Sequence, residues 1–309
     1  RVAPVALPSD AAARAAVVGL SGPVLLADEA ALLRAALPVG VILFARNIQD
    51  PVQLRHLVAS VRDLGTAVLV DQEGGRVARL RPPHWPAFAA AAAHDTPDAV
   101  RDTGAAIGQA CAALGIGVVC APVLDLRWPG GHDVIGDRAY GADPAHVAAM
   151  GRAMADGLLS AGVLPVAKHA PGHGRAEADS HLALPVVRGD LAQDIAPFQA
   201  LHDLPWMMTA HILYPDIDPD WPATLSSRLI GTVIRGMIGF PGVLVSDDLA
   251  MQALRGTPGE RAARAIAAGC DVAMHCSGVL EDSAAVLEAA GRLTPLAAAR
   301  LAAGWSLVA

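Results

Sequence analysis

The segment from Lys168 to Pro185 concentrates side chains that can transfer protons. It reads KHAPGHGRAEADSHLALP, and Asp179 stands two residues before His181. A carboxylate at this spacing can accept the ring N–H of the histidine, fix its tautomer and stabilise its cation. A histidine held in this way can protonate a leaving group, so Asp179 and His181 are candidates for an acid–base pair on an ordered loop. An isolated D-x-H sequence is more often an incidental hydrogen bond, and the surrounding pattern has to decide.

The same segment has an alternative interpretation as a metal site. His169 and His173 have the i, i+4 spacing of zinc-binding helices. Pro171, Gly172 and Gly174 oppose a helix at this place, and the glutamate of the H-E-x-x-H motif is missing. We therefore expect no metal ion and no other cofactor.

Further polar side chains follow short apolar runs elsewhere in the chain. They are Arg46 and Asn47, Asp71, Gln72 and Glu73, Asp125, Lys168 and His169, His211, and Asp247 and Asp248. In parallel barrels the chemistry takes place at the carboxyl ends of the strands. Loop polar residues without a function would be spread over both ends of a barrel. Acids, histidines and a lysine gathered at one end therefore predict a single polar pocket.

Eight short apolar runs are the strand candidates. Most of them are apolar almost throughout, which is typical of parallel strands covered on both faces. They are Val17–Leu20, Val39–Phe44, Thr66–Asp71, Ile116–Ala121, Val163–Lys168, Pro205–Ala210, Gly242–Ser246 and Cys270–His275.

Helical patterns lie between these runs, for example Glu29–Leu37, Val52–Leu64, Pro97–Leu114, Pro144–Ala161 and Glu260–Ala268. Asp50 and Asp143 each place a cap acceptor before a first-turn proline. Eight βα units in series predict an α/β fold with a single TIM-like (β/α)8 barrel. No linker rich in glycine, serine or proline divides the chain, so residues 1–309 are expected to form one catalytic domain. A Rossmann-like sheet is the alternative, but no G-x-G-x-x-G follows the first strand.

Composition and charge exclude several classes of partner. The chain is 53% hydrophobic and 17% charged, which indicates a globular protein, and its net charge of -7 without a basic block argues against nucleic acid. No apolar run approaches the roughly 20 residues that cross a bilayer. The four cysteines form no C-x-x-C pair, so buried free thiols are expected. With no secretory leader in view, these features predict a cytoplasmic location, although a segment before Arg1 stays open.

Taken together and in order, several motifs resemble those of family-3 glycoside hydrolases, in particular the bacterial β-N-acetylglucosaminidase branch. They are LFARN (Leu43–Asn47), DQEGGRVARL (Asp71–Leu80), APVLDL (Ala121–Leu126), VIGDRAYGADP (Val134–Pro144), the Lys168–Pro185 segment, TAHILYPDID (Thr209–Asp218), PATLS (Pro222–Ser226) and SDDLAM (Ser246–Met251). Two places depart from the family pattern. Ala170 stands where an aromatic residue is usual, and Arg175-Ala176 stand where Asp-Thr is usual, which puts the shape of the loop in question.

The resemblance implies a role for each motif residue. It makes Asp247 the nucleophile, and it makes His181 the acid/base, assisted by Asp179. The sugar-binding set that it implies is Asp71, Arg79, Arg138, Lys168 and His169. A strand-end aspartate is held rigidly, which suits a nucleophile, and Asp248 next to it should point elsewhere as a helix cap or supporting acceptor. Arg138 has the alternative of an ion pair with Asp137 or Asp143.

The resemblance also implies a substrate. Members of this branch release terminal N-acetylglucosamine from small oligosaccharide or muropeptide fragments of the cell wall, notably those ending in anhydro-N-acetylmuramic acid. A histidine acid/base also occurs in relatives that use phosphate, so a phosphorylase is the nearest rival. A sugar-binding barrel without catalysis is the rival from another class, but such a barrel would need no nucleophile.

Overall fold

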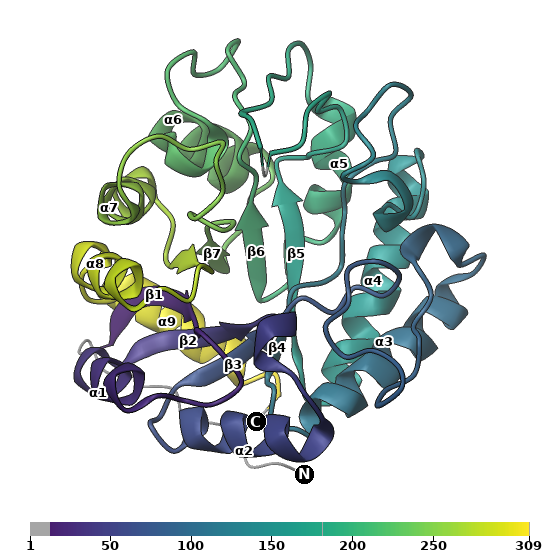
Figure 1. Cartoon of the computed structure of the whole chain (residues 1–309). Coiled ribbons are helices and arrows are strands. Elements are labelled where there is room, and N and C mark those ends of the chain that lie inside the picture. The colour runs from purple at the N-terminus through teal and green to yellow at the C-terminus, as the bar shows by residue number, and fades with distance from the viewer. Residues whose placement is uncertain (1–12, 181, 309) are drawn as a thin grey trace.

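Eight parallel strands form one continuous sheet that curves into a barrel (Figure 1). The computed structural model describes residues 13–180 and 182–308. The strands are β1 (Arg14–Gly19), β2 (Pro38–Leu43), β3 (Ala67–Val70), β4 (Val118–Val119), β5 (Leu164–Ala170), β6 (Trp206–Thr209), β7 (Val243–Val245) and β8 (Ala273–His275). Their order in the sheet is β7-β6-β5-β4-β3-β2-β1-β8.

The two ends of this sheet meet. Val245 of β7 forms a parallel bridge with Val272, just before β8. Backbone N–H groups of Ser246 and Leu249 donate to the carbonyl oxygens of Val272 and Met274 at 3.0 and 2.8 Å. The predicted single TIM-like barrel is therefore confirmed.

Helices alternate with the strands and surround the sheet (Figure 1). They are α1 (Ala27–Ala36), α2 (Pro51–Arg62), α3 (Pro97–Ala112), α4 (Pro144–Ser160), α5 (Ala192–Ala200), α6 (Ser227–Leu229, continued by the π-helical turns Ile230–Met237), α7 (Pro258–Ala268), α8 (Leu280–Ala290) and α9 (Pro295–Trp305). The predicted caps are confirmed: the Asp50 carboxylate accepts from two backbone N–H groups of α2, and that of Asp143 does the same for α4.

The strand boundaries differ from the predicted ones where pairing extends or shortens a run. β1 begins three residues early because Arg14 pairs with Pro38 of β2. β4 shrinks to two residues, and the chain beyond it, including Pro122, runs beside β5 instead. Lys168 donates its N–H to the Pro122 oxygen at 3.0 Å, so β5 continues to Ala170. Lys168 and His169 consequently lie within a strand and are held more rigidly than loop residues.

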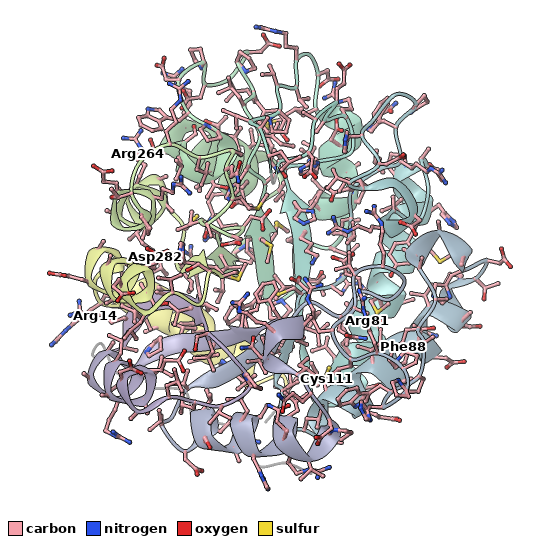
Figure 2. All side chains as sticks on the ribbon, viewed as in Figure 1. Arg14, Arg81, Phe88, Cys111, Arg264 and Asp282 are labelled. Carbon is pink, nitrogen blue, oxygen red and sulfur yellow. The ribbon has the colours of Figure 1, made fainter. Side chains whose placement is uncertain are left out.

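The end of the barrel opposite the strand carboxyl ends is covered by α9. A Cβ atom on Gly117, just before β4, would come within 3.0 Å of the Trp305 ring, and one on Gly304 within 3.4 Å of Trp206 at the start of β6. All four cysteines are buried and free, as predicted; Cys111 is marked in Figure 2. Over the described ranges, no helix is both long and apolar enough to cross a bilayer.

Helices α3 and α4 approach each other through glycines, and this close packing supports the strand that follows α4. A Cβ atom on Gly157 would strike the backbone oxygen of Arg101 and stand 2.7 Å from the backbone nitrogen of Ala105. Gly104 makes the reciprocal approach from α3, where a Cβ would lie 2.6 Å from the Met154 oxygen. Backbone atoms cannot move aside as a side chain can, so a methyl group has no room here.

We predict that Gly157→Ala destabilises the protein by about 1–3 kcal/mol, because overpacking outweighs the gain in helix propensity. Gly231→Ala is the matched control, since a Cβ there meets nothing within 4 Å. It should leave stability unchanged or raise it by up to about 1 kcal/mol. Urea unfolding of both variants measures the difference, and equal midpoints would contradict the predicted clash.

Candidate active site

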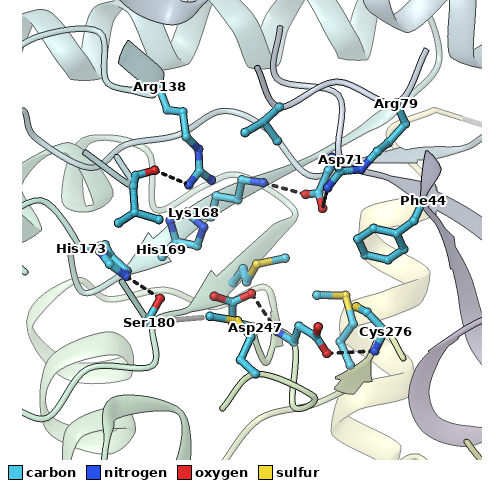
Figure 3. A pocket seen from close by; sticks show the side chains of 16 residues that line it. Phe44, Asp71, Arg79, Arg138, Lys168, His169, His173, Ser180, Asp247 and Cys276 are labelled. Atoms are coloured by element: carbon cyan, nitrogen blue, oxygen red, sulfur yellow. Dashed lines mark hydrogen bonds and ion pairs between the residues drawn. The ribbon is translucent and has the colours of Figure 1, made fainter. Parts of the chain in front are cut away.

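The loops after the strands surround a pocket of about 190 Å³. This volume is below the roughly 300 Å³ at which sites for drug-sized ligands begin, so the pocket suits one small ring. Six of the eight residues to which the resemblance gave a catalytic or sugar-binding role line it: Asp71, Arg79, Arg138, Lys168, His169 and Asp247 (Figure 3). They come from the carboxyl ends of three strands, β3, β5 and β7, and from the turn Gly136–Arg138, so only the closed barrel brings them together.

A buried network of charges forms one wall of the pocket. The Lys168 ammonium donates to Asp71 Oδ1 at 2.8 Å and lies 2.6 Å from Glu73 Oε1. Arg138 grips Glu73 with two nitrogens, each at 2.8 Å. Arg79 donates to Asp71 Oδ2 at 3.2 Å. Each carboxylate is thus shared by two cations, and the side chain of Lys168 is only 2% exposed.

The pKa shifts keep this network charged. Burial alone would raise the pKa of Glu73, but Arg138 and Lys168 outweigh it and lower that pKa to about 2. The pKa of Asp71 is lowered for the same reason, by Lys168 and Arg79. Burial would lower the pKa of Lys168, yet the two carboxylates raise it. All these groups are ionised at neutral pH, and they offer fixed donors and acceptors to a polar ligand.

Arg138 has a different partner from either alternative considered in the sequence. Asp137 pairs with Arg76 at 2.8 Å, and Asp143 caps α4. Arg138 instead forms its ion pair with Glu73. The sequence reasoning gave Glu73 no role, although its spacing carried a signal: Asp71 and Glu73 are two residues apart as the chain leaves β3, and such residues face the same side in extended backbone.

Gln72 folds the segment after β3 back over the pocket. Its side-chain oxygen accepts from the backbone N–H groups of Arg79 and Leu80 at 2.8 and 2.9 Å. The turn between them needs Gly74, whose φ is 101°, because a Cβ there would collide with the Ala89 oxygen. Arg79 is thereby brought back beside Asp71. Its guanidinium carbon also lies 5.0 Å from the centre of the Phe44 ring, another pocket-lining side chain.

Asp125 orients His169 and the chain beyond it. Its carboxylate is fully buried and lies 2.6 Å from His169 Nδ1, and it accepts from the backbone N–H of His173 at 2.7 Å. Burial would raise the pKa of Asp125, but the two histidines outweigh it and lower that pKa. A carboxylate on Nδ1 fixes the ring and leaves Nε2 as the nitrogen that can meet a ligand. In the sequence Asp125 stands out as a polar residue at a strand end, but the pattern does not indicate this function.

His173 links the end of β5 to the segment that carries Asp179. Its Nε2 lies 2.8 Å from the hydroxyl of Ser180, and both side chains line the pocket. Burial lowers the pKa of His173 to about 4, against the opposing charge of Asp125, so the ring is neutral at pH 7. The carbonyl oxygen of Asp179 accepts from the N–H groups of Leu182 and Ala183, which closes a turn. His181 lies outside the described residues, so its role as the acid/base stays a prediction.

The two adjacent aspartates after β7 have different surroundings, as predicted. Asp247 lines the pocket, its N–H donates to the Thr209 hydroxyl at 3.3 Å, and its Oδ1 accepts from the next N–H at 2.8 Å. Asp248 Oδ1 accepts from the N–H groups of Ala250 and Cys276 at 2.8 and 2.9 Å. Asp248 therefore joins the loops after β7 and β8 as a supporting acceptor, although it lines the pocket as Asp247 does. His169 and His173 do not share a helix, in agreement with the prediction, because β5 includes His169.

Comparison with known proteins agrees with this geometry. The model of the glycosyl hydrolase family 3 N-terminal domain matches residues 23–303. A β-hexosaminidase of Pseudomonas aeruginosa (strain LESB58) is 38% identical over 273 residues, covering 84% of this chain and 82% of the relative.

Two solved structures are similar over 96% of this chain. A family 3 β-N-acetylglucosaminidase from Paenibacillus sp. str. FPU-7 matches with a TM-score of 0.87 at 32% identity, and the chain spans 61% of that longer protein. NagZ from Neisseria gonorrhoeae, in complex with N-trifluoroacetyl-D-glucosamine, matches over 98% of its length with a TM-score of 0.79 at 30% identity. Because the family model and the curated relative each cover most of the chain, the protein belongs to glycosyl hydrolase family 3 and is a glycoside hydrolase.

Proposed function

We propose that the protein is a retaining, exo-acting β-N-acetylglucosaminidase that removes terminal N-acetylglucosamine from peptidoglycan fragments. The observation that carries this proposal is the composition of the pocket. A charged, hydrogen-bonding wall built on Asp71, Lys168 and Arg138 shares one small pocket with the strand-end carboxylate of Asp247. Such a pocket suits a single polar ring with one reactive carbon.

In this proposal the network binds the non-reducing-end sugar. Asp71 accepts from sugar hydroxyls, while Lys168, Arg79 and Arg138 donate to hydroxyl oxygens, and His169 offers Nε2. Each of these cations is already held by a carboxylate, so binding of the sugar costs little further side-chain conformational entropy. The paired carboxylates also neutralise the three cations, so the pocket does not favour anions as its main ligands.

The chemistry proceeds by two displacements at the anomeric carbon. The Asp247 carboxylate attacks this carbon and forms a covalent glycosyl ester, while His181, assisted by Asp179, gives a proton to the departing oxygen. His181 then takes a proton from water, the water oxygen attacks the anomeric carbon, and Asp247 is released. One histidine serves both steps because the reference pKa of about 6.5 lies near neutral pH.

The names of similar proteins support the choice of sugar. The curated relative is a β-hexosaminidase, and the solved structures include β-N-acetylglucosaminidases. The proposed substrates are small muropeptides, in which anhydro-N-acetylmuramic acid carries a peptide. The proposal includes a cytoplasmic location, in keeping with four buried free thiols.

A direct assay separates the proposal from its rivals. The protein is incubated with an aryl β-N-acetylglucosaminide, with and without phosphate, and the released sugar is identified. Release of free N-acetylglucosamine at a rate that does not depend on phosphate would support hydrolysis. A sugar 1-phosphate would establish a phosphorylase, and binding without turnover would establish a carbohydrate-binding barrel.

We predict that Asp247→Asn lowers kcat roughly 10⁴-fold, because the amide cannot form the ester. A slow fluorosugar should label the wild-type peptide that contains Asp247, as detected by mass spectrometry. Asp98→Asn is the matched control, since the Asp98 side chain is 89% exposed on α3 and should not affect the rate. A label on Asp71 or Asp248 would refute the assignment.

We predict that His181→Ala slows the hydrolysis of natural disaccharides far more than that of activated aryl glycosides, because the aryl group leaves without protonation. With aryl substrates, hydrolysis of the intermediate should become limiting, and azide should accelerate it by replacing the water that the histidine activates. Equal losses on both substrates, without an effect of azide, would show that another group is the acid/base, and Glu177 would be the next carboxylate to test.

A further inference from the structure

One guanidinium holds both ends of the loop that carries Asp179. Arg175 stands at the start of this loop, two residues after His173. Its Nη1 donates to the carbonyl oxygen of Arg188 at 2.9 Å, and its Nη2 donates to that of Asp190 at 2.7 Å. These acceptors lie 13 and 15 residues farther along the chain, where the loop returns toward α5. The guanidinium of Arg175 therefore joins the first and last residues of the loop, Arg175 and residues 188–190, which together are called the loop base below.

The same side chain fastens this base to the barrel. Arg175 Nη2 lies 2.8 Å from Asp194 Oδ2, and Asp194 is 3% exposed in α5. Asp194 also accepts from the indole N–H of Trp128 at 3.2 Å, and the guanidinium carbon of Arg175 lies 5.6 Å from the centre of the Trp128 ring. Trp128 belongs to the long connection between β4 and α4, which also carries Arg138. The loop base is thus joined to two other parts of the pocket rim.

Beyond this base the loop has further fixed points. Val187 donates its N–H to the Leu213 oxygen, and Leu213 donates to the Pro185 oxygen, both at 2.9 Å. The Ser180 hydroxyl meets His173 near the pocket. The base of the loop, its returning arm and Ser180 are thus each held by contacts of described residues.

We propose that Arg175 is a positioning residue for catalysis: by tying the loop ends to each other and to Asp194, it holds the segment that carries Asp179. This inference rests on the proposed function, in which Asp179 assists His181 in protonating the leaving group.

The choice of variant follows from the surroundings of Asp194. Burial raises the pKa of Asp194 even though Arg175 opposes the shift, so removing the cation would leave a buried carboxyl without its partner. Arg175→Met is therefore expected to cost stability as well as activity. Arg175→Lys keeps the positive charge but loses the planar fork that reaches the two carbonyl oxygens and Asp194 together.

The control comes from the same loop. Arg188→Met removes one positive charge, as Arg175→Met does, but keeps the main-chain oxygen that Arg175 binds. The Arg188 side chain is 69% exposed, and its one side-chain hydrogen-bond and ion-pair partner among the described residues is Asp216, at 3.4 Å. An exposed pair of this kind contributes little, so Arg188→Met should match the wild type in stability and rate.

We expect Arg175→Lys to lower kcat/KM for a disaccharide about tenfold, to change that for an activated aryl glycoside less than twofold, and to leave the KM of both nearly unchanged. Amide hydrogen exchange should become faster in residues 176–187 and stay unchanged in α5. Arg188→Met should alter neither measurement. If Arg175→Lys only destabilised the protein in general, kcat/KM would fall by the same factor for both substrates.

Two outcomes would overturn the proposal: equal losses on the two substrates, or wild-type rates together with wild-type exchange in the loop. His181→Ala, measured beside it, separates this inference from the function on which it rests. If His181→Ala discriminates between leaving groups and Arg175→Lys does not, only the role of Arg175 fails. If His181→Ala does not discriminate either, the acid/base assignment itself fails, and the positioning role fails with it.

Discussion

The organisation of the pocket depends on the burial of Lys168. An ammonium group that is 2% exposed cannot remain charged without partners, and the fold supplies Asp71 and Glu73 together. Glu73 in turn needs the planar guanidinium of Arg138. The segment just before the turn that presents Arg138 is held by Arg76, which donates to the carbonyl oxygens of Val134 and Ile135. One strand residue therefore determines the position of side chains drawn from two separate connections, those after β3 and β4. Because every charge is shared, displacing one member weakens the rest.

This network also accounts for the balance of charge around the pocket. Lys168, Arg79 and Arg138 are offset by the carboxylates of Asp71, Glu73, Asp247 and Asp248, so the cations need no anion from outside. The neutral ring of His173 adds hydrogen bonding without another cation. Glycoside cleavage moves protons and develops positive charge at carbon, and in the proposed mechanism Asp247 is the carboxylate that stabilises this charge.

Local patterns in the sequence were sufficient for the barrel and for most of the pocket. Apolar runs and capping residues such as Asp50 report directly on strands and helices, and strand ends locate Asp71, Lys168 and Asp247. Partners were harder to predict, because Glu73 and Arg138 lie 65 residues apart and either could have paired nearby. The clamp of Arg175 could not be predicted at all, since two of its acceptors are main-chain oxygens, which every residue possesses and no sequence pattern marks.

The helix α9 packs against the starts of β4 and β6, so it lies at the end of the barrel away from the pocket. A polypeptide fused after Trp305 would leave from that closed end and keep the mouth clear of the added mass. The same geometry favours attachment of the protein to a solid support through its C-terminal side, because diffusing oligosaccharides would still meet an unobstructed opening.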